Sequence, residues 1–159
     1  MTTITDRTIN HRTINHRAVR SLTATWIGGP TLRLTYAGLT FLTDPTFDDP
    51  GEYPGAVTLR KLTGPALRPD QIGPVDAVLL SHDQHADNLD TSGRRFLREV
   101  PVVLSTPAAA ERLAAEHLAA ERVDGVRGLA PWQTQTLGAP GGDVRVTAVP
   151  ARHGPEGCE

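Results

Sequence analysis

A ten-residue stretch, SHDQHADNLD at Ser81–Asp90, carries the side chains of this chain that are best suited to chemistry. It holds two imidazoles and three carboxylates: His82, His85, Asp83, Asp87 and Asp90. Such groups bind catalytic metal ions when several of them lie close together on a rigid support. The apolar run VDAVLL directly before the stretch is typical of a buried strand, which would supply that support. The alternative is a polar loop whose histidines cap the next helix; the number of ligand types in so short a stretch favours the metal site.

A further histidine, His153, follows the predicted strand VRVTAVP. Loops that leave the same end of a sheet lie close together, so we expect His153 to converge with His85 and Asp87. We expect His82 nearby, and the spacing leaves open whether it acts as a ligand. The candidate metal ligands are therefore His82, His85, Asp87 and His153.

The remaining histidines and the single cysteine are weaker candidates. His11 and His16 belong to a tandem copy of RTINH within residues 1–20, a basic, Thr/Asn-rich segment with little to bury. We expect this segment to be a frayed or disordered arm. His117 lies in a predicted helix and is expected at its surface. Cys158 lies next to the chain end and is not expected to bind the metal.

Apolar periodicity and turn residues predict the elements that position these side chains. Strands are expected at SLTATWI, TLRLTYA and LTFLTD as an antiparallel meander, and at 75–81, 101–105, TQTL and 143–149. Helices are expected near 91–98 and 107–122. Residues 44–74 are rich in Pro and Gly and are expected to form a long irregular loop, of the kind that often borders a site. Because strands come first and then alternate with helices, the pattern predicts a layered α/β domain over residues 21–159.

Composition excludes several classes of function. The formal net charge is −2 and aromatic residues make up 4% of the 159 residues, which argues against nucleic acid or an anionic membrane as a partner. No apolar stretch is long enough for a membrane span or resembles a signal peptide. One cysteine allows no internal disulfide, which favours a reducing compartment. We therefore expect a cytoplasmic protein; a small-molecule substrate is implied only by the family resemblance that the following segments carry.

Three segments in order resemble metallo-β-lactamase-fold hydrolases, of the branch that includes ascorbate-6-phosphate lactonase-like enzymes. ATWIGGPTLRLTYAGLTFLTDPTF resembles the opening strands, VDAVLLSHDQHADNLD the strand that leads into a His-x-His-x-Asp-His-Leu-Asp motif, and VTAVPARHGP the strand that delivers a later metal-binding histidine. The resemblance implies the N-terminal half of an αββα sandwich. His85, Asp87 and His153 match the family's ligands, and Asp87 would both bind the metal and orient the attacking hydroxide.

The chain departs from the family motif at other positions. Asp83 falls where the first histidine belongs, with His82 displaced by one residue, and Asn88 falls on the third histidine. Asp83 would be a hard oxygen ligand, whereas Asn88 is a poor replacement for imidazole. Gly29 and Pro30 stand where a His-Ala pair is common. These changes favour harder ions such as Mn or Mg, and the loss of a ligand favours one ion over two. The cofactor that the resemblance implies is a divalent metal, Zn or Mn, as one or two ions.

The resemblance implies a metal-dependent hydrolase acting on a lactone, ester or phosphodiester. It also implies residues that the 159-residue chain does not contain, namely a bridging aspartate in a Gly-Asp-Thr/Ser turn and a late histidine. We therefore expect a truncated domain, inactive and weakly metal-binding alone, that self-associates through an uncovered apolar sheet face or is poorly soluble. The alternative is a catalytically inactive relative that acts as a binding or assembly unit.

Overall fold

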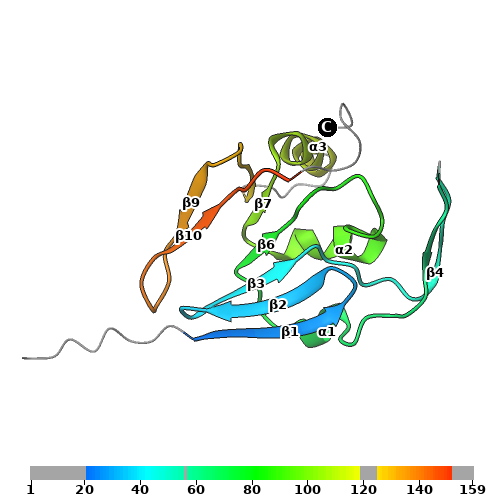
Figure 1. Ribbon diagram of the computed structural model, residues 1–159, viewed down its shortest axis with the longest axis horizontal. Coiled ribbons are helices and arrows are strands. Elements are labelled where there is room, and N and C mark those ends of the chain that lie inside the picture. Colours follow the sequence, from blue (N-terminus) through cyan, green and yellow to red (C-terminus); the bar gives the residue numbers. More distant parts are fainter. Residues whose placement is uncertain (1–20, 56, 119–124, 152–159) are drawn as a thin grey trace, which may run out of the picture.

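The computed structural model describes residues 21–55, 57–118 and 125–151. Their central element is a six-stranded sheet (Figure 1). Its first three strands, β1 (Leu22–Gly28), β2 (Thr31–Tyr36) and β3 (Leu39–Thr43), pair antiparallel in chain order. Gly29 and Gly38 in the two turns have φ of 51° and 86°, a region that glycine adopts without steric cost. The predicted meander is confirmed. The arm predicted at 1–20 lies outside the described residues.

Three parallel strands extend the sheet beyond β3 in the order β3-β6-β7-β8. They are β6 (Ala77–Leu79), β7 (Val103–Ser105) and β8 (Val126–Gly128). The crossovers hold α2 (Thr91–Phe96), the 3₁₀ turn η1 (Leu97–Glu99) and α3 (Pro107–Leu118). The strands β6 and β7 confirm the predictions at 75–81 and 101–105, and α2 and α3 confirm both predicted helices. The predicted C-terminal end of the second helix and the side chain of His117 lie outside the described residues. No helix in the described part of the chain is both long and apolar enough to cross a bilayer.

The segment 44–74 is more regular than the sequence indicates. It contains the antiparallel hairpin of β4 (Gly51–Tyr53) and β5 (Leu59–Lys61), followed by the single turn α1 (Pro69–Ile72). The prediction of an irregular loop was therefore wrong over these elements. Each strand is only three residues long and largely exposed, so neither could produce an alternating apolar pattern.

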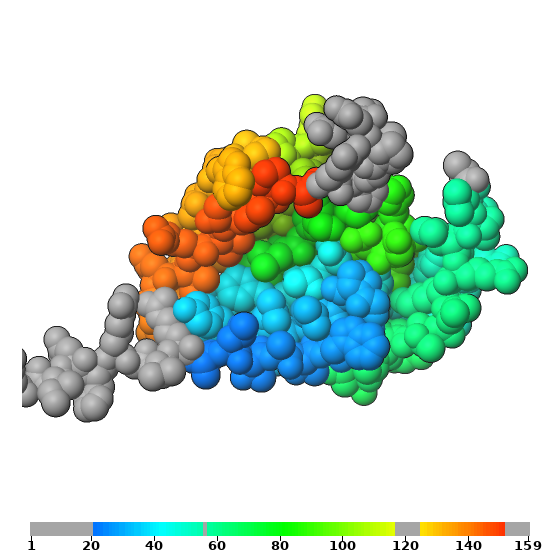
Figure 2. Space-filling view, in the orientation of Figure 1, coloured from blue at the N-terminus to red at the C-terminus, as the bar shows by residue number. Residues whose placement is uncertain are grey.

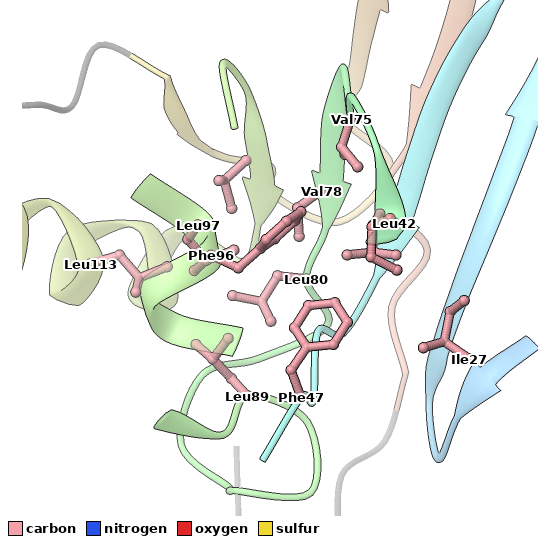
Figure 3. Packing of buried hydrophobic residues seen from close by; sticks show 12 residues of the cluster. Ile27, Leu42, Phe47, Val75, Val78, Leu80, Leu89, Phe96, Leu97 and Leu113 are labelled. Atoms are coloured by element: carbon pink, nitrogen blue, oxygen red, sulfur yellow. The ribbon is translucent and has the colours of Figure 1, made fainter. Parts of the chain in front are cut away.

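One face of the sheet carries the main core (Figure 3). Leu42, Val78 and Val103 from three neighbouring strands are at most 2% exposed. Phe96 of α2 and Leu113 of α3 join them in one cluster, so the helices cover this face. Successive strand residues point to opposite faces, and the neighbours Phe41 and Ala77 accordingly belong to a second cluster.

The second face is covered by the hairpin of β9 (Thr134–Leu137) and β10 (Val144–Thr147). Val144 and Leu137 pack there with Phe41 and Ala77, so the predicted strand pair forms and shields part of the face that we expected to be bare. The cover does not reach β1: Leu22 is 62% exposed and the side chain of Trp26 lies 68% exposed. Figure 2 shows the hairpin in orange at the upper left and the first strands in blue along the lower edge, with cyan and green atoms between them.

Candidate functional site

The motif loop, Ser81–Asp90, leaves the carboxyl end of β6 as a series of turns, where the sequence predicts it. The backbone carbonyl of His85 accepts hydrogen bonds from the amides of Asn88 and Leu89, at 3.1 and 3.0 Å. Leu89 is 4% exposed and belongs to the helix-side core, so one end of the loop is anchored by apolar burial. The carboxyl ends of parallel strands are the usual place for ligand sites in open α/β sheets.

The two imidazoles of the loop face each other. His82 Nε2 lies 3.2 Å from His85 Nδ1, and the ring planes are nearly perpendicular at 88°. Both rings reach the surface, His82 half-buried and His85 exposed. The structure therefore brings together two of the four predicted ligands.

The other two predicted ligands are placed differently. Asp87 is exposed and lines a cavity next to the loop, whereas His153 lies outside the described residues. Within residues 21–55, 57–118 and 125–151, no group of three His, Cys, Asp or Glu side chains is close enough to hold one ion. The predicted convergence of His85, Asp87 and His153 therefore stays a prediction.

A hydrogen-bonded chain supports His82 from behind. Ser81 Oγ lies 3.0 Å from His82 Nδ1 and accepts a hydrogen bond from Asn88 Nδ2 at 3.0 Å. The backbone amide of Ser81 donates to Asp44 Oδ1 at 2.7 Å. When His82 Nδ1 donates to Ser81, His82 Nε2 is the unprotonated ring nitrogen and accepts the hydrogen bond from His85 Nδ1. Supporting groups around metal-binding histidines fix the tautomer in the same way. Asn88 thus contacts Ser81, which in turn contacts the His82 ring, instead of taking the place of a histidine ligand.

Asp44 is a site residue that the sequence analysis missed. It follows β3, and its φ of 30° is unusual for a residue with a side chain. Burial raises the pKa of the Asp44 carboxyl, and the hydrogen bonds from Ser81 only partly oppose this. The signal was available in LTFLTDP, where an Asp-Pro pair follows a strand at the edge that also carries the motif loop.

Asp83 points away from the imidazoles, and the expectation that it would be a hard metal ligand was wrong. Its side chain is 3% exposed and accepts hydrogen bonds from Arg112 Nε at 3.0 and 3.2 Å. Arg94 Nη2 donates to the backbone carbonyl of Asp83 at 2.8 Å and Arg94 also pairs with Glu116. Burial alone would raise the pKa of the Asp83 carboxyl, but the Arg112 guanidinium holds it below its usual value.

Asp90 is likewise structural rather than a ligand. It caps α2 by accepting from the amide of Gly93 at 2.8 Å, and it also accepts from the amides of Phe47 and Asp48 at 2.9 and 2.7 Å. Lys61 of β5 completes the set, with Nζ 3.0 Å from Asp90 Oδ2. A fully buried carboxylate with this many donors has no oxygen left for an ion.

The two facing nitrogens of the imidazole pair lie within hydrogen-bond distance of each other, and their separation can be compared with that of two ligands on one ion. Two nitrogens bound at about 2.0–2.1 Å to one tetrahedral zinc ion lie roughly 3.3 Å apart. The separation of 3.2 Å between His82 Nε2 and His85 Nδ1 is close to that value. Two neutral nitrogen donors with a hydroxyl behind one of them are also chemically suited to Zn or Mn.

Comparisons with known proteins agree with this fold. The family model described as "Beta-lactamase superfamily domain" matches residues 40–157. The structure of an isothiocyanate hydrolase from Delia radicum gut bacteria is similar with a TM-score of 0.51 and 24% identity, over 67% of this chain and 41% of that one. A possible metal-dependent hydrolase from Veillonella parvula DSM 2008 is similar with a TM-score of 0.58 and 23% identity, over 74% and 44%. The chain thus spans less than half the length of either protein, and the predicted α/β fold is confirmed.

Proposed function

Because the chain belongs to the beta-lactamase superfamily, we propose that it forms part of a metal-dependent hydrolase whose ion is bound by the motif loop. His82 and His85 are the primary ligands in this proposal, and Asp87 and His153 complete the set. The observation that carries the proposal is the separation of 3.2 Å between His82 Nε2 and His85 Nδ1. The possible metal-dependent hydrolase among the similar structures supports the same class of chemistry.

The ion would polarise an electrophilic carbon or phosphorus and make water a stronger nucleophile at neutral pH. The chain's own residues would do the rest. Ser81 and Asn88 hold the His82 ring in one orientation. The Asp87 carboxylate lines the neighbouring cavity, where it can orient the attacking water and accept its proton.

Lactones, esters and phosphodiesters are the substrate classes that we propose, in line with the resemblance to ascorbate-6-phosphate lactonase-like enzymes. The similarity to an isothiocyanate hydrolase adds a further neutral electrophile to this set. Zn and Mn, as one or two ions, suit the mixed nitrogen and oxygen donors. A cytoplasmic location remains part of the proposal because the chain has a single cysteine.

Titration calorimetry with Zn²⁺ and Mn²⁺ tests the proposal on the 159-residue chain. A His82→Ala/His85→Ala double variant should lose more affinity than the roughly 10–100-fold typical of losing a supporting residue. Hydrolysis of δ-valerolactone, p-nitrophenyl acetate and bis(p-nitrophenyl) phosphate should then be compared with and without the ion. The measurement of metal affinity stands even where turnover is slow.

Gln84→Ala is the matched control, because Gln84 lies between the two histidines and is exposed. It should leave metal affinity unchanged. Equal affinity of the double variant and the parent chain for both ions would contradict the proposal.

A binding or assembly unit is the second candidate, and the open surface of β1 favours it. Trp26 pairs with Leu32 and Leu22 with Tyr36 in the sheet register, which places these side chains on one face. Leu22 and Trp26 are 62% and 68% exposed. Self-association through this face predicts a dimer in sedimentation velocity that Trp26→Ser disrupts; a monomer at all concentrations rejects it.

A further inference from the structure

A cavity of about 320 Å³ adjoins the motif loop. It lies between the turn after β1, which contributes Gly28, Gly29 and Pro30, and the hairpin of β4 and β5. Ala86 and Asp87, which follow His85 in the chain, form the wall that belongs to the motif loop. Its size is at the lower end of the range for small-molecule sites.

The cations of the cavity wall are already paired. Lys61 Nζ lies 3.0 Å from Asp90 Oδ2, and Arg60 Nε lies 2.8 Å from Glu52 Oε1. Among the described residues that line the cavity, Asp87 is the acidic one, and it forms no ion pair with another described residue. The wall therefore offers no surplus positive charge to a phosphate or carboxylate group of a ligand.

The remaining lining is largely apolar. Leu59, Leu62, Pro30 and Pro65 supply hydrocarbon surface, and Gly28 and Gly29 let the backbone approach a ligand. Thr46 also lines the cavity, and a Cβ added at Gly29 would lie 3.7 Å from Thr46 Oγ1, at van der Waals distance. Small-molecule sites typically combine such an apolar lining with a few polar groups that fix orientation.

The hairpin that closes the cavity is held in place. Lys61 ties β5 to the buried Asp90, and the hydroxyl of Tyr53 in β4 donates to Asp48 Oδ2 at 3.1 Å. Asp48 in turn accepts from the amides of Thr91 and Ser92 at the start of α2. Both strands are therefore attached to the same helix terminus, which keeps the cavity formed without a ligand.

From these features we propose that the cavity binds the apolar group of a neutral substrate. The electrophilic group of that substrate would lie toward Asp87 and the imidazole pair, and its organic group would lie against Leu59, Leu62 and the Gly28-Gly29 backbone. This inference rests on the proposed hydrolase and narrows its substrates to lactones and neutral esters with an apolar tail. Phosphodiesters, which are anionic, are disfavoured because Lys61 and Arg60 each pair with a carboxylate and Asp87 adds a further negative charge to the wall.

The test is binding of three probes to the 159-residue chain in EDTA, where turnover plays no part. δ-Nonalactone is neutral with an alkyl tail, δ-valerolactone lacks the tail, and 5-hydroxynonanoate keeps the carbon skeleton but is an anion. Amide chemical shifts of Gly28, Gly29 and Leu62 report on the cavity. δ-Nonalactone should bind about tenfold or more tightly than either of the others, because the tail removes apolar surface from water.

Leu59→Ser and Leu62→Ser should each weaken δ-nonalactone binding several-fold. Val57→Ser is the matched control, since Val57 is 75% exposed between the same two strands and does not line the cavity. Tighter binding of 5-hydroxynonanoate, or shifts that avoid Gly28 and Gly29, would overturn the inference. If the 159-residue chain binds δ-nonalactone but binds neither Zn²⁺ nor Mn²⁺, the result counts against the proposed hydrolase and leaves the inference about the cavity in place.

Discussion

The motif loop contains two kinds of polar residue that differ in where they point. Asp83 and Asp90 turn inward, with side chains that are 3% and 0% exposed, and together they hold Arg112, Lys61 and the start of α2. His82, His85 and Asp87 turn outward to the surface and the cavity. Different residues of one short loop thus belong to the core contacts and to the proposed site.

This difference shows that residue type alone did not identify the ligands. All three aspartates have the same intrinsic ability to bind a cation, yet two of them are already surrounded by protein donors. A buried carboxylate must be paired because its desolvation is otherwise too costly. The outward group, by contrast, reaches the surface, where His82 contacts Ser81 and His85, and Asp87 lines the cavity.

The largest effect should come from Asp90. Asp90→Ala leaves Lys61 and three backbone amides without their acceptor, so we expect a loss of about 3–5 kcal/mol in the free energy of unfolding. Asp87→Ala, three residues earlier in the same loop, should stay within about 0.5 kcal/mol because Asp87 is exposed. Urea denaturation of both variants measures the contrast. Similar losses in the two variants would remove the distinction between inward and outward carboxylates.

Asp83 should have a smaller effect. Asp83→Asn keeps the shape of the side chain but removes the charge that faces Arg112, at a cost of about 1.5–3 kcal/mol in unfolding free energy. In the Arg112→Met background the same change should cost clearly less, because the pair has already been broken. A double-mutant cycle by urea denaturation checks this, and strict additivity would show that the two side chains do not interact.

The smallest effect should appear as a pH dependence. Because Arg112 holds the pKa of Asp83 below its usual value, the carboxylate contributes stability above the unfolded pKa of about 3.9, and this contribution is lost as pH falls through the folded value. The stability difference between the parent chain and Asp83→Asn should therefore be full at about pH 6 and shrink below about pH 4. Asp48, whose pKa is also lowered, is present in both proteins, so its contribution cancels. A difference that stays constant down to acid pH would contradict the role given to Arg112.

The sequence predicted well the elements with strong apolar runs or caps, and it predicted poorly those without them. The meander, β6, β7, α2 and α3 have strong apolar patterns or caps, and all were expected near their observed positions. The strands β4, β5 and β8 are as short as β6 and β7, but they are exposed or half-buried and lack the buried apolar run that marked those two. They form because a neighbouring segment pairs with them, β4 with β5 and β8 with β7, and an apolar pattern does not report that pairing.

The candidate site was predictable in location but not in detail. An imidazole-rich loop after a buried strand indicated the right sheet edge, and His82 and His85 do meet there. Asp44 was missed because its partner Ser81 lies 37 residues later. The inward turn of Asp83 depends on Arg112, 29 residues away on α3, and no local pattern encodes that contact.

The mixed order of the central sheet has a consequence for the time course of folding. The strands β1, β2 and β3 pair with chain neighbours, so their contacts are local and we expect them to form early, even while later segments are still being synthesised. The parallel pairing of β3 with β6 requires closure over the whole β4–β5 segment first. Asp44 therefore emerges with the early hairpins but gains Ser81 only when β6 docks, so the motif loop is added to a meander that is already in place.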